Sequence, residues 1–184
     1  MAVDSYKWLP GSLANYYRAL PLQKAEPIPW TPLAKPIEEC RFSLVTSAGL
    51  YLKEKQPPFD LDRERQDPFW GDPTYRTIPR DVKQGEIGVA HLHINTADLE
   101  ADINIALPVH RFLELEAAGE IGSLAPTSYS FMGYQGNPPN TDEWENRYGP
   151  EMAARMREEA VDADVLARTQ AFVWELLQRI DSRQ

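Results

Sequence analysis

Residues 86–111 decide the fold, and they read EIGVAHLHINTADLEADINIALPVHR. The stretch holds all three histidines of the chain, His91, His93 and His110. Side chains alternate along a strand, so His91 and His93 leave the same face of the strand predicted here. An acidic loop follows, and Pro108 suits the first turn of a helix. The stretch therefore predicts a strand, a loop and a helix start in succession.

Two further strands are predicted on either side of this stretch. Residues 41–46 are a hydrophobic run that ends in small residues, and residues 121–125 follow a helical segment closed by Gly119. Strands that alternate with helices favour right-handed crossovers between parallel strands. We therefore expect an α/β fold, with a three-layer open sheet of mainly parallel strands and helices on both faces. Strands 41–46, 87–94 and 121–125 are expected at its centre.

The chain is expected to divide into two parts. Residues 1–36 contain many aromatic residues and prolines, which predicts an extended N-terminal arm. Residues 37–184 are long enough for a single α/β domain with its own core. The arm and the apolar face of a helix predicted over residues 168–180 present a large apolar area. They predict a homo-oligomer, in the first place a dimer, or a partner subunit.

Composition excludes several classes of protein. The formal net charge of −9 disfavours a nucleic acid or an anionic membrane as partner. No apolar run approaches the roughly 20 residues of a membrane helix, and the N-terminus lacks the pattern of a secretory signal. Cys40 is the single cysteine, so an intrachain disulfide is excluded. We therefore expect a cytoplasmic protein.

Hydroxyl groups and glycine follow two of the predicted strands. Thr46, Ser47 and Gly49 come after the first strand, and Tyr129 and Ser130 lie in the segment after the third. Ligands of open α/β sheets lie beyond the carboxyl ends of the strands. These residues are therefore predicted to meet the histidines in one pocket for a small-molecule substrate.

Tyr75 and Arg76 follow a turn over residues 71–74, within a long proline-rich loop. A fixed arginine binds a carboxylate through two parallel hydrogen bonds, so Arg76 is a predicted substrate contact. The alternative is a surface turn with a salt bridge. The predicted catalytic residues are His91, His93, Tyr75 and Ser130. The predicted substrate-binding residues are Arg76, Thr46, Ser47, Gly49 and Tyr129.

The histidines have three interpretations. His91, His93 and His110 form a ligand set suited to a divalent metal, Zn²⁺ or Fe²⁺. His91 and His93 also suit acid/base chemistry, because histidine exchanges protons near neutral pH. The third interpretation is structural, with both side chains held by hydrogen bonds at a strand end. Cys40 precedes the first strand, and we interpret it as a small, partly buried hydrophobe.

A series of motifs in order resembles the selenoprotein B family of glycine, sarcosine, betaine and D-proline reductases, over about residues 28–165. They are PWTPLAKP (29–36), CRFSLVTSAG (40–49), PFD (58–60), GDPTYRTIP (71–79), HLH (91–93), DIN (102–104), GEIGSLAP (119–126) and SFMG (130–133). The resemblance implies an α/β subunit of a reductase. In members that reduce substrate, a selenocysteine or cysteine pair reductively cleaves a carbon–nitrogen bond.

This chain departs from the family at that pair. The family's pair follows a strand that resembles VDAVLL, whereas residues 161–168 read VDADVLAR and contain no cysteine. We therefore expect an enzyme that acts on a small amino-acid-like carboxylate through histidine-based acid/base or metal-assisted chemistry. The alternative is a non-catalytic subunit, or a ligand-binding partner, of a larger reductase-type complex.

Overall fold

The computed structural model describes residues 7, 10–19, 35–67, 69–92, 94–135 and 142–162. The chain divides into two compact units, Met1–Trp30 and Thr31–Gln184. In the first unit the structure describes helix α1 (Gly11–Ala19). The predicted boundary at residue 36 stays a prediction. The helix predicted over residues 168–180 lies outside the described residues, as does most of the proline-rich part of the arm.

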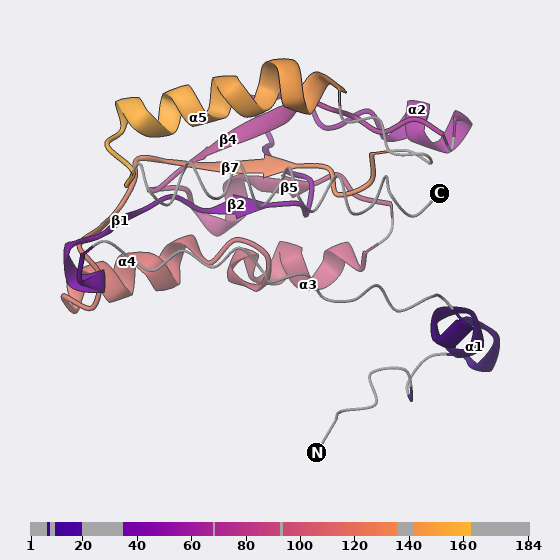
Figure 1. Ribbon diagram of the computed structural model, residues 1–184, viewed down its shortest axis with the longest axis horizontal. Helices are drawn as coiled ribbons and strands as arrows, with labels where there is room; N and C mark the ends of the chain where they lie inside the picture. The colour runs from indigo at the N-terminus through magenta and orange to yellow at the C-terminus, as the bar shows by residue number, and fades with distance from the viewer. Residues whose placement is uncertain are drawn as a thin grey trace. The chain divides into compact units, whose positions relative to one another are not determined.

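The second unit contains short strands and helices in alternation (Figure 1). Its described strands are β1 (Arg41–Phe42), β2 (Val45–Thr46), β3 (Leu50–Leu52), β4 (Tyr75–Pro79), β5 (Ile87–Val89), β6 (Ser123–Leu124) and β7 (Thr127–Phe131). Its described helices and helical turns are η1 (Ile37–Glu39), α2 (Leu61–Gln66), η2 (Gln84–Glu86), α3 (Thr96–Ala101), η3 (Ile103–Ile105), α4 (Val109–Ala117), η4 (Trp144–Tyr148) and α5 (Gly149–Glu158). None of the described helices is both long and apolar enough to span a bilayer.

The strand pairing is mixed. β1 lies parallel to β6 and β2 lies parallel to β7, whereas β4 pairs antiparallel with β7 and β3 pairs antiparallel with β5. Two hydrogen bonds, from Ala125 N to Phe42 O and from Tyr129 N to Leu44 O, join the two parallel pairs. Residues 41–46 therefore run beside residues 123–131 along their whole length.

The α/β class agrees with the sequence prediction, but a three-layer open sheet of mainly parallel strands is not confirmed. The strand predicted over residues 87–94 ends at Val89 and is antiparallel to its neighbour. The strand predicted over residues 121–125 is followed, after Pro126, by β7, which extends to Phe131. Both differences arise because strand direction and length depend on hydrogen bonds to distant segments, which periodicity does not record.

Residues of β7 alternate between two cores. Tyr129 packs with Met156 of α5 and with Val161, and the hydroxyl of Thr127 donates to Glu159 just after α5. Ser130 points the other way, and its hydroxyl accepts from Leu50 N at 2.7 Å. Figure 1 shows α5 over one face of the sheet and α3 and α4 on the other side.

The larger core lies on the side of α4. Its buried apolar residues come from β3, β4, β5, β6, η3 and α4 and from the segments beside β4 and α4: Leu50, Leu52, Ile78, Val82, Ile87, Ile103, Leu107, Val109 and Leu124. Each such side chain contributes roughly 1.5–3 kcal/mol when it leaves water. This core therefore packs η3 and α4 against β3, β4, β5 and β6, next to the site described below.

Candidate functional site

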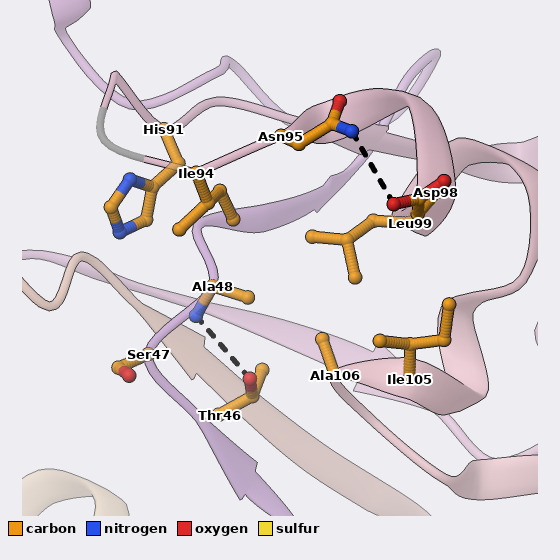
Figure 2. A pocket seen from close by; sticks show the side chains of 10 residues that line it. All are labelled: Thr46, Ser47, Ala48, His91, Ile94, Asn95, Asp98, Leu99, Ile105 and Ala106. Carbon is orange, nitrogen blue, oxygen red and sulfur yellow. Dashed lines mark hydrogen bonds between the residues drawn. The ribbon is translucent and has the colours of Figure 1, made fainter. Parts of the chain in front are cut away.

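A cavity of about 420 Å³ lies where β2 ends (Figure 2). Its lining residues come from the segment after β2, the segment after β5, and the α3–η3 region: Thr46, Ser47, Ala48, His91, Ile94, Asn95, Asp98, Leu99, Ile105 and Ala106. Small-molecule sites typically measure roughly 300–1,000 Å³. The cavity therefore has the size of a site for a small metabolite.

A close backbone approach brings the segments after β2 and β5 together. Gly49 has a φ of +67°, and a Cβ added there would lie 2.2 Å from Ala90 O, so a side chain is excluded. Ala90 N also donates to Gly49 O at 2.9 Å. This contact places Ser47 and His91, which are 44 positions apart, in the lining of the same cavity.

The cap of α3 forms the opposite wall. Asn95 Oδ1 accepts from Ala97 N at 3.1 Å, and Asn95 Nδ2 donates to Asp98 Oδ2 at 3.3 Å (Figure 2). Gln84 attaches this wall to β5, because its side chain donates to Glu100 O at 2.8 Å and accepts from Ile103 N at 2.7 Å. The wall is therefore held by hydrogen bonds as well as by packing.

The lining of the cavity combines several polar side chains with an apolar surface. Hydroxyls, an imidazole, an amide and the Asp98 carboxylate are the polar groups of the lining, and Ile94, Leu99 and Ile105 are its large apolar side chains. Neither lysine nor arginine is among the described lining residues. Such a surface suits a small ligand with a polar or positively charged end and a short apolar body.

Three of the predicted site residues meet in this cavity, namely Thr46, Ser47 and His91. Thr46 Oγ1 accepts from Ala48 N at 3.3 Å, which turns the chain as the strand ends. Gly49 is buried one turn further on and serves as the backbone contact described above. His93 lies outside the described residues, so its part in the site stays a prediction.

Tyr129 and Ser130 do not line the cavity. Both are fully buried, because β7 continues through them instead of ending before them as the sequence predicted. Burial raises the pKa of the Tyr129 hydroxyl above its ordinary value, and the nearby Glu159 adds to this effect. Their predicted contacts with a substrate stay predictions that the fold does not favour.

Tyr75 and Arg76 lie on β4, and each has partners within the fold. The Tyr75 hydroxyl donates to Glu151 Oε1 at 3.0 Å, and burial together with this bond raises the pKa of Tyr75 to about 12. The Arg76 guanidinium donates to the backbone oxygens of Pro57 and Pro58 and stacks on Phe59 at 4.3 Å. Burial lowers the pKa of Arg76 from its ordinary value. Arg76 therefore ties the loop before α2 to the sheet, away from the lining of the cavity.

His110 also has partners for both ring nitrogens. Its Nδ1 lies 3.2 Å from Asn104 Nδ2, and its Nε2 lies 2.9 Å from Val82 O. Across the part of the chain that the structure describes, no three His, Cys, Asp or Glu side chains are grouped as metal ligands. A metal set of His91, His93 and His110 requires His93, which is not described, and it stays a prediction.

Asn95, Asp98 and Ile105 are cavity residues that sequence reasoning missed. A signal for two of them exists, because Asn95 followed three positions later by Asp98 is typical of a helix N-cap with an acidic first turn. That signal predicts the start of α3 at the loop after β5. Nothing in the local sequence indicates that Ile105 reaches the same cavity.

Cys40 lies immediately before β1, at the opposite end of residues 41–46 from Thr46. It is 2% exposed, so it is more deeply buried than the partly buried hydrophobe that the sequence predicted. Burial, followed by the Asp162 carboxylate, raises the pKa of its thiol. The single cysteine of the sequence is therefore neither close to the cavity nor disposed to form a thiolate.

An α/β fold with a small-molecule cavity at a strand end defines a broad class of ligand-binding and catalytic proteins. The comparisons narrow this class. Residues 12–169 match the model of the glycine/sarcosine/betaine reductase selenoprotein B family. The chain belongs to this family.

Two curated relatives carry reductase names. D-proline reductase subunit gamma of Acetoanaerobium sticklandii is 34% identical over 137 residues, which are 74% of this chain and 52% of the relative. Glycine reductase complex component B subunit gamma of Carboxydothermus hydrogenoformans is 26% identical over 155 residues, which are 84% of this chain and 34% of the relative. This chain therefore spans about half the length of the first relative and about a third of the second. No solved structure matches the chain.

Proposed function

We propose that the chain is the substrate-binding component of a selenoprotein B-type reductase complex. Its cavity holds a small amino-acid-like carboxylate, and the redox group of the complex lies outside the printed residues. The observation that carries the proposal is the convergence of Ser47, His91 and Asp98 on one cavity of metabolite size. The names of the two relatives, both of which are reductase subunits, support the assignment to a complex.

The lining suits the ammonium end and the apolar part of such a ligand, and its hydroxyls are the groups that can donate to the ligand carboxylate. The Asp98 carboxylate balances a ligand ammonium group, and Ser47 and Thr46 donate hydrogen bonds through their hydroxyls. His91 exchanges a proton with the ligand or with a leaving amine. Ile94, Leu99 and Ile105 cover the apolar part of the ligand.

Reductive cleavage of a carbon–nitrogen bond needs a thiolate or selenolate nucleophile. The printed sequence contains one cysteine, and that residue is buried at the far end of the strand that leads to the cavity. We infer that the nucleophile of the complex lies outside the printed residues. The second candidate function is a non-catalytic subunit without a ligand of its own. The burial of the single cysteine away from the cavity favours this candidate as well.

Binding separates the two candidates. We expect the purified chain to bind D-proline or glycine in calorimetry, and His91→Gln to weaken that binding at least tenfold. The melting temperature of His91→Gln should stay within a few degrees, because a site side chain contributes little packing. The matched control is His110→Gln, which lies outside the cavity lining and should keep the affinity of the wild type.

Two results would count against the ligand-binding proposal. One is a wild-type chain that binds neither amino acid in the presence or absence of its partner subunits. The other is an equal loss of affinity in His91→Gln and His110→Gln. Either result leaves the non-catalytic subunit as the function.

A further inference from the structure

The lining of the cavity changes in character between its inner end and its mouth. Among the described lining residues, Thr46 and Leu99 are buried, with exposed fractions of 8% and 5%. Ser47, Asn95 and Asp98 are exposed. The buried residues therefore mark the inner end of the cavity, and the exposed polar residues mark its mouth.

The inner end is largely apolar. Ala48 and Ala106 are half-buried there, and Figure 2 shows their methyl groups and the Leu99 side chain facing the same space. The Thr46 hydroxyl is also present, but its oxygen already accepts from Ala48 N at 3.3 Å. A charged group of a ligand would lose its water at this end without gaining a charged partner, which is unfavourable. A hydrocarbon group is therefore the kind of group that fits the inner end.

Gln84 of η2 holds the apolar walls of the inner end in place. Its side-chain amide donates to Leu99 O at 3.3 Å and accepts from Ile103 N at 2.7 Å. Ile103 is fully buried, and its backbone oxygen accepts from Ala106 N at 3.0 Å. Leu99 and Ala106 are therefore tied to one another through a single side chain and one helical turn. Walls that are fixed in this way distinguish groups of different size, because they do not close around a smaller one.

We propose that the cavity selects its ligand by the hydrocarbon part, which enters the inner end beside Leu99 and Ala106 while the ammonium group stays at the mouth beside Asp98. The ligand class is an amino acid with a hydrocarbon side chain or ring. Glycine is a poor ligand, because it leaves the inner end to water. Ala106 is a specificity-determining residue, because a larger side chain there occupies the space of the hydrocarbon part. This inference rests on the proposed function, since it orients a ligand in the same cavity.

A homologous series of amino acids tests the inner end. Glycine, D-alanine, D-2-aminobutyrate and D-norvaline share their ammonium and carboxylate groups and differ by one methylene at each step. Calorimetry on the full chain should show an affinity that rises about fourfold per methylene, or about 60-fold from glycine to D-norvaline, because each methylene leaves water. Equal affinities across the series overturn the inference and leave the proposed function standing. If none of the four binds, the proposed function and the inference both fail.

D-Serine tests whether the inner end is apolar or merely has room. It carries a hydroxyl where D-2-aminobutyrate carries a methyl group, and the two side chains are similar in size. We expect D-serine to bind at least tenfold more weakly, because its hydroxyl lacks partners beside Leu99 and Ala106. Equal affinities of the two amino acids would show that the inner end accepts a polar group, and would overturn the inference.

Substitutions at the two ends of the cavity test the orientation of the ligand. Ala106→Leu should lower the ratio of D-norvaline to glycine affinity at least tenfold, because the added side chain fills the inner end. Asp98→Asn should weaken the whole series by a similar factor and keep the ratio, because every member carries the ammonium group. The matched control is Ala101→Leu, at an exposed position of α3 outside the described lining, which should keep both the affinities and the ratio.

Two results with these variants would overturn the proposed orientation. One is a ratio that stays unchanged in Ala106→Leu, and the other is a ratio that collapses in Asp98→Asn. Melting temperatures identify a variant that does not fold, and the wild-type series then decides the inference without it.

Discussion

At the scale of single residues, Asp72 joins two of the motifs that identify the family. Its side chain is buried, with Oδ2 accepting from Asp60 N at 3.1 Å and Oδ1 accepting from Thr74 N at 2.9 Å. Gln135 Nε2 donates to the Asp72 backbone oxygen at 3.0 Å. The carboxylate therefore holds residues 58–60 against residues 71–76, which also contain Arg76.

We predict that Asp72→Asn lowers the free energy of unfolding by about 1–3 kcal/mol, the cost of leaving a buried hydrogen-bonding group unsatisfied. In either orientation of the asparagine amide, its Nδ2 faces a backbone N–H, that of Asp60 or that of Thr74. Both groups are donors, so one hydrogen bond is lost. Urea unfolding measures the change. The control is Asp62→Asn, which removes an exposed ion pair with Arg65 and should cost less than about 0.5 kcal/mol. Equal losses in the two variants would contradict the prediction.

At the scale of elements, Glu116 connects the end of α4 to the sheet. Its Oε2 accepts from Leu124 N at 2.7 Å and from Arg80 Nη2 at 2.8 Å. Arg80 Nη1 in turn donates to Leu124 O at 2.6 Å, so α4, β6 and the residue after β4 are joined. The Leu124 N–H, and after it Arg80, lowers the pKa of Glu116 below its ordinary value of 4.5.

This lowered pKa predicts a pH dependence. Because the pKa of Glu116 is lower in the folded state, its contribution is fully present above pH 4.5 and is lost as the pH falls through the folded value. We expect Glu116→Gln to be less stable than wild type by about 1–2 kcal/mol at pH 7. The difference in the free energy of unfolding between wild type and Glu116→Gln should decrease in acid, as measured by denaturant unfolding at several pH values. A stability difference that stays constant on acidification would show that the charge of Glu116 does not cause the lower stability of the variant.

The matched control is Glu114→Gln on the same helix. Glu114 pairs with Arg111 at 2.7 Å in an exposed i, i+3 arrangement. Such pairs contribute about 0.3–0.5 kcal/mol. Its effect on stability should therefore be small at every pH.

At the scale of the whole molecule, two large apolar side chains are exposed to solvent on the single chain. Phe69 is 69% exposed and Ile105, at the cavity, is 65% exposed. The two described relatives are named as subunits, and this chain covers only part of each. We propose on these grounds that the protein assembles, either with another copy or with partner chains.

We predict a dimer at micromolar concentration, with about twice the 21.0 kDa of the single chain. Sedimentation velocity measures this directly. The interface predicted from sequence uses the N-terminal arm or the apolar face of residues 168–180, so Phe172→Asp should shift the population toward the monomer if the second surface is used. A single species of 21.0 kDa at all concentrations would contradict the prediction and leave partner subunits as the remaining form of assembly.

The sequence by itself determined the family and the α/β class, and it predicted three of the residues that line the candidate cavity. The motifs lie in order along the chain, and hydrophobic runs that end in small residues mark strand ends. The rule that parallel strand ends gather at one edge predicted Thr46, Ser47 and His91 together, and the structure places all three in the cavity lining. The cause differs from the predicted one, because β5 is antiparallel to β3 and the close approach of Gly49 and Ala90 brings the segments together. Such local signals can be predicted from the sequence because they depend on side-chain chemistry and spacing alone.

Only the tertiary structure decided strand direction, and with it the remaining site residues. The turn at Gly49 sends β3 back along β5, which makes that pair antiparallel. Tyr129 is buried because β7 continues through it. Arg76 donates its hydrogen bonds to the loop before α2 instead of to a ligand. Asp98 reaches the cavity because the α3–η3 region forms one of its walls. Each outcome depends on hydrogen bonds and packing between segments far apart in the chain, and the local pattern of residues does not encode which distant partner a segment meets.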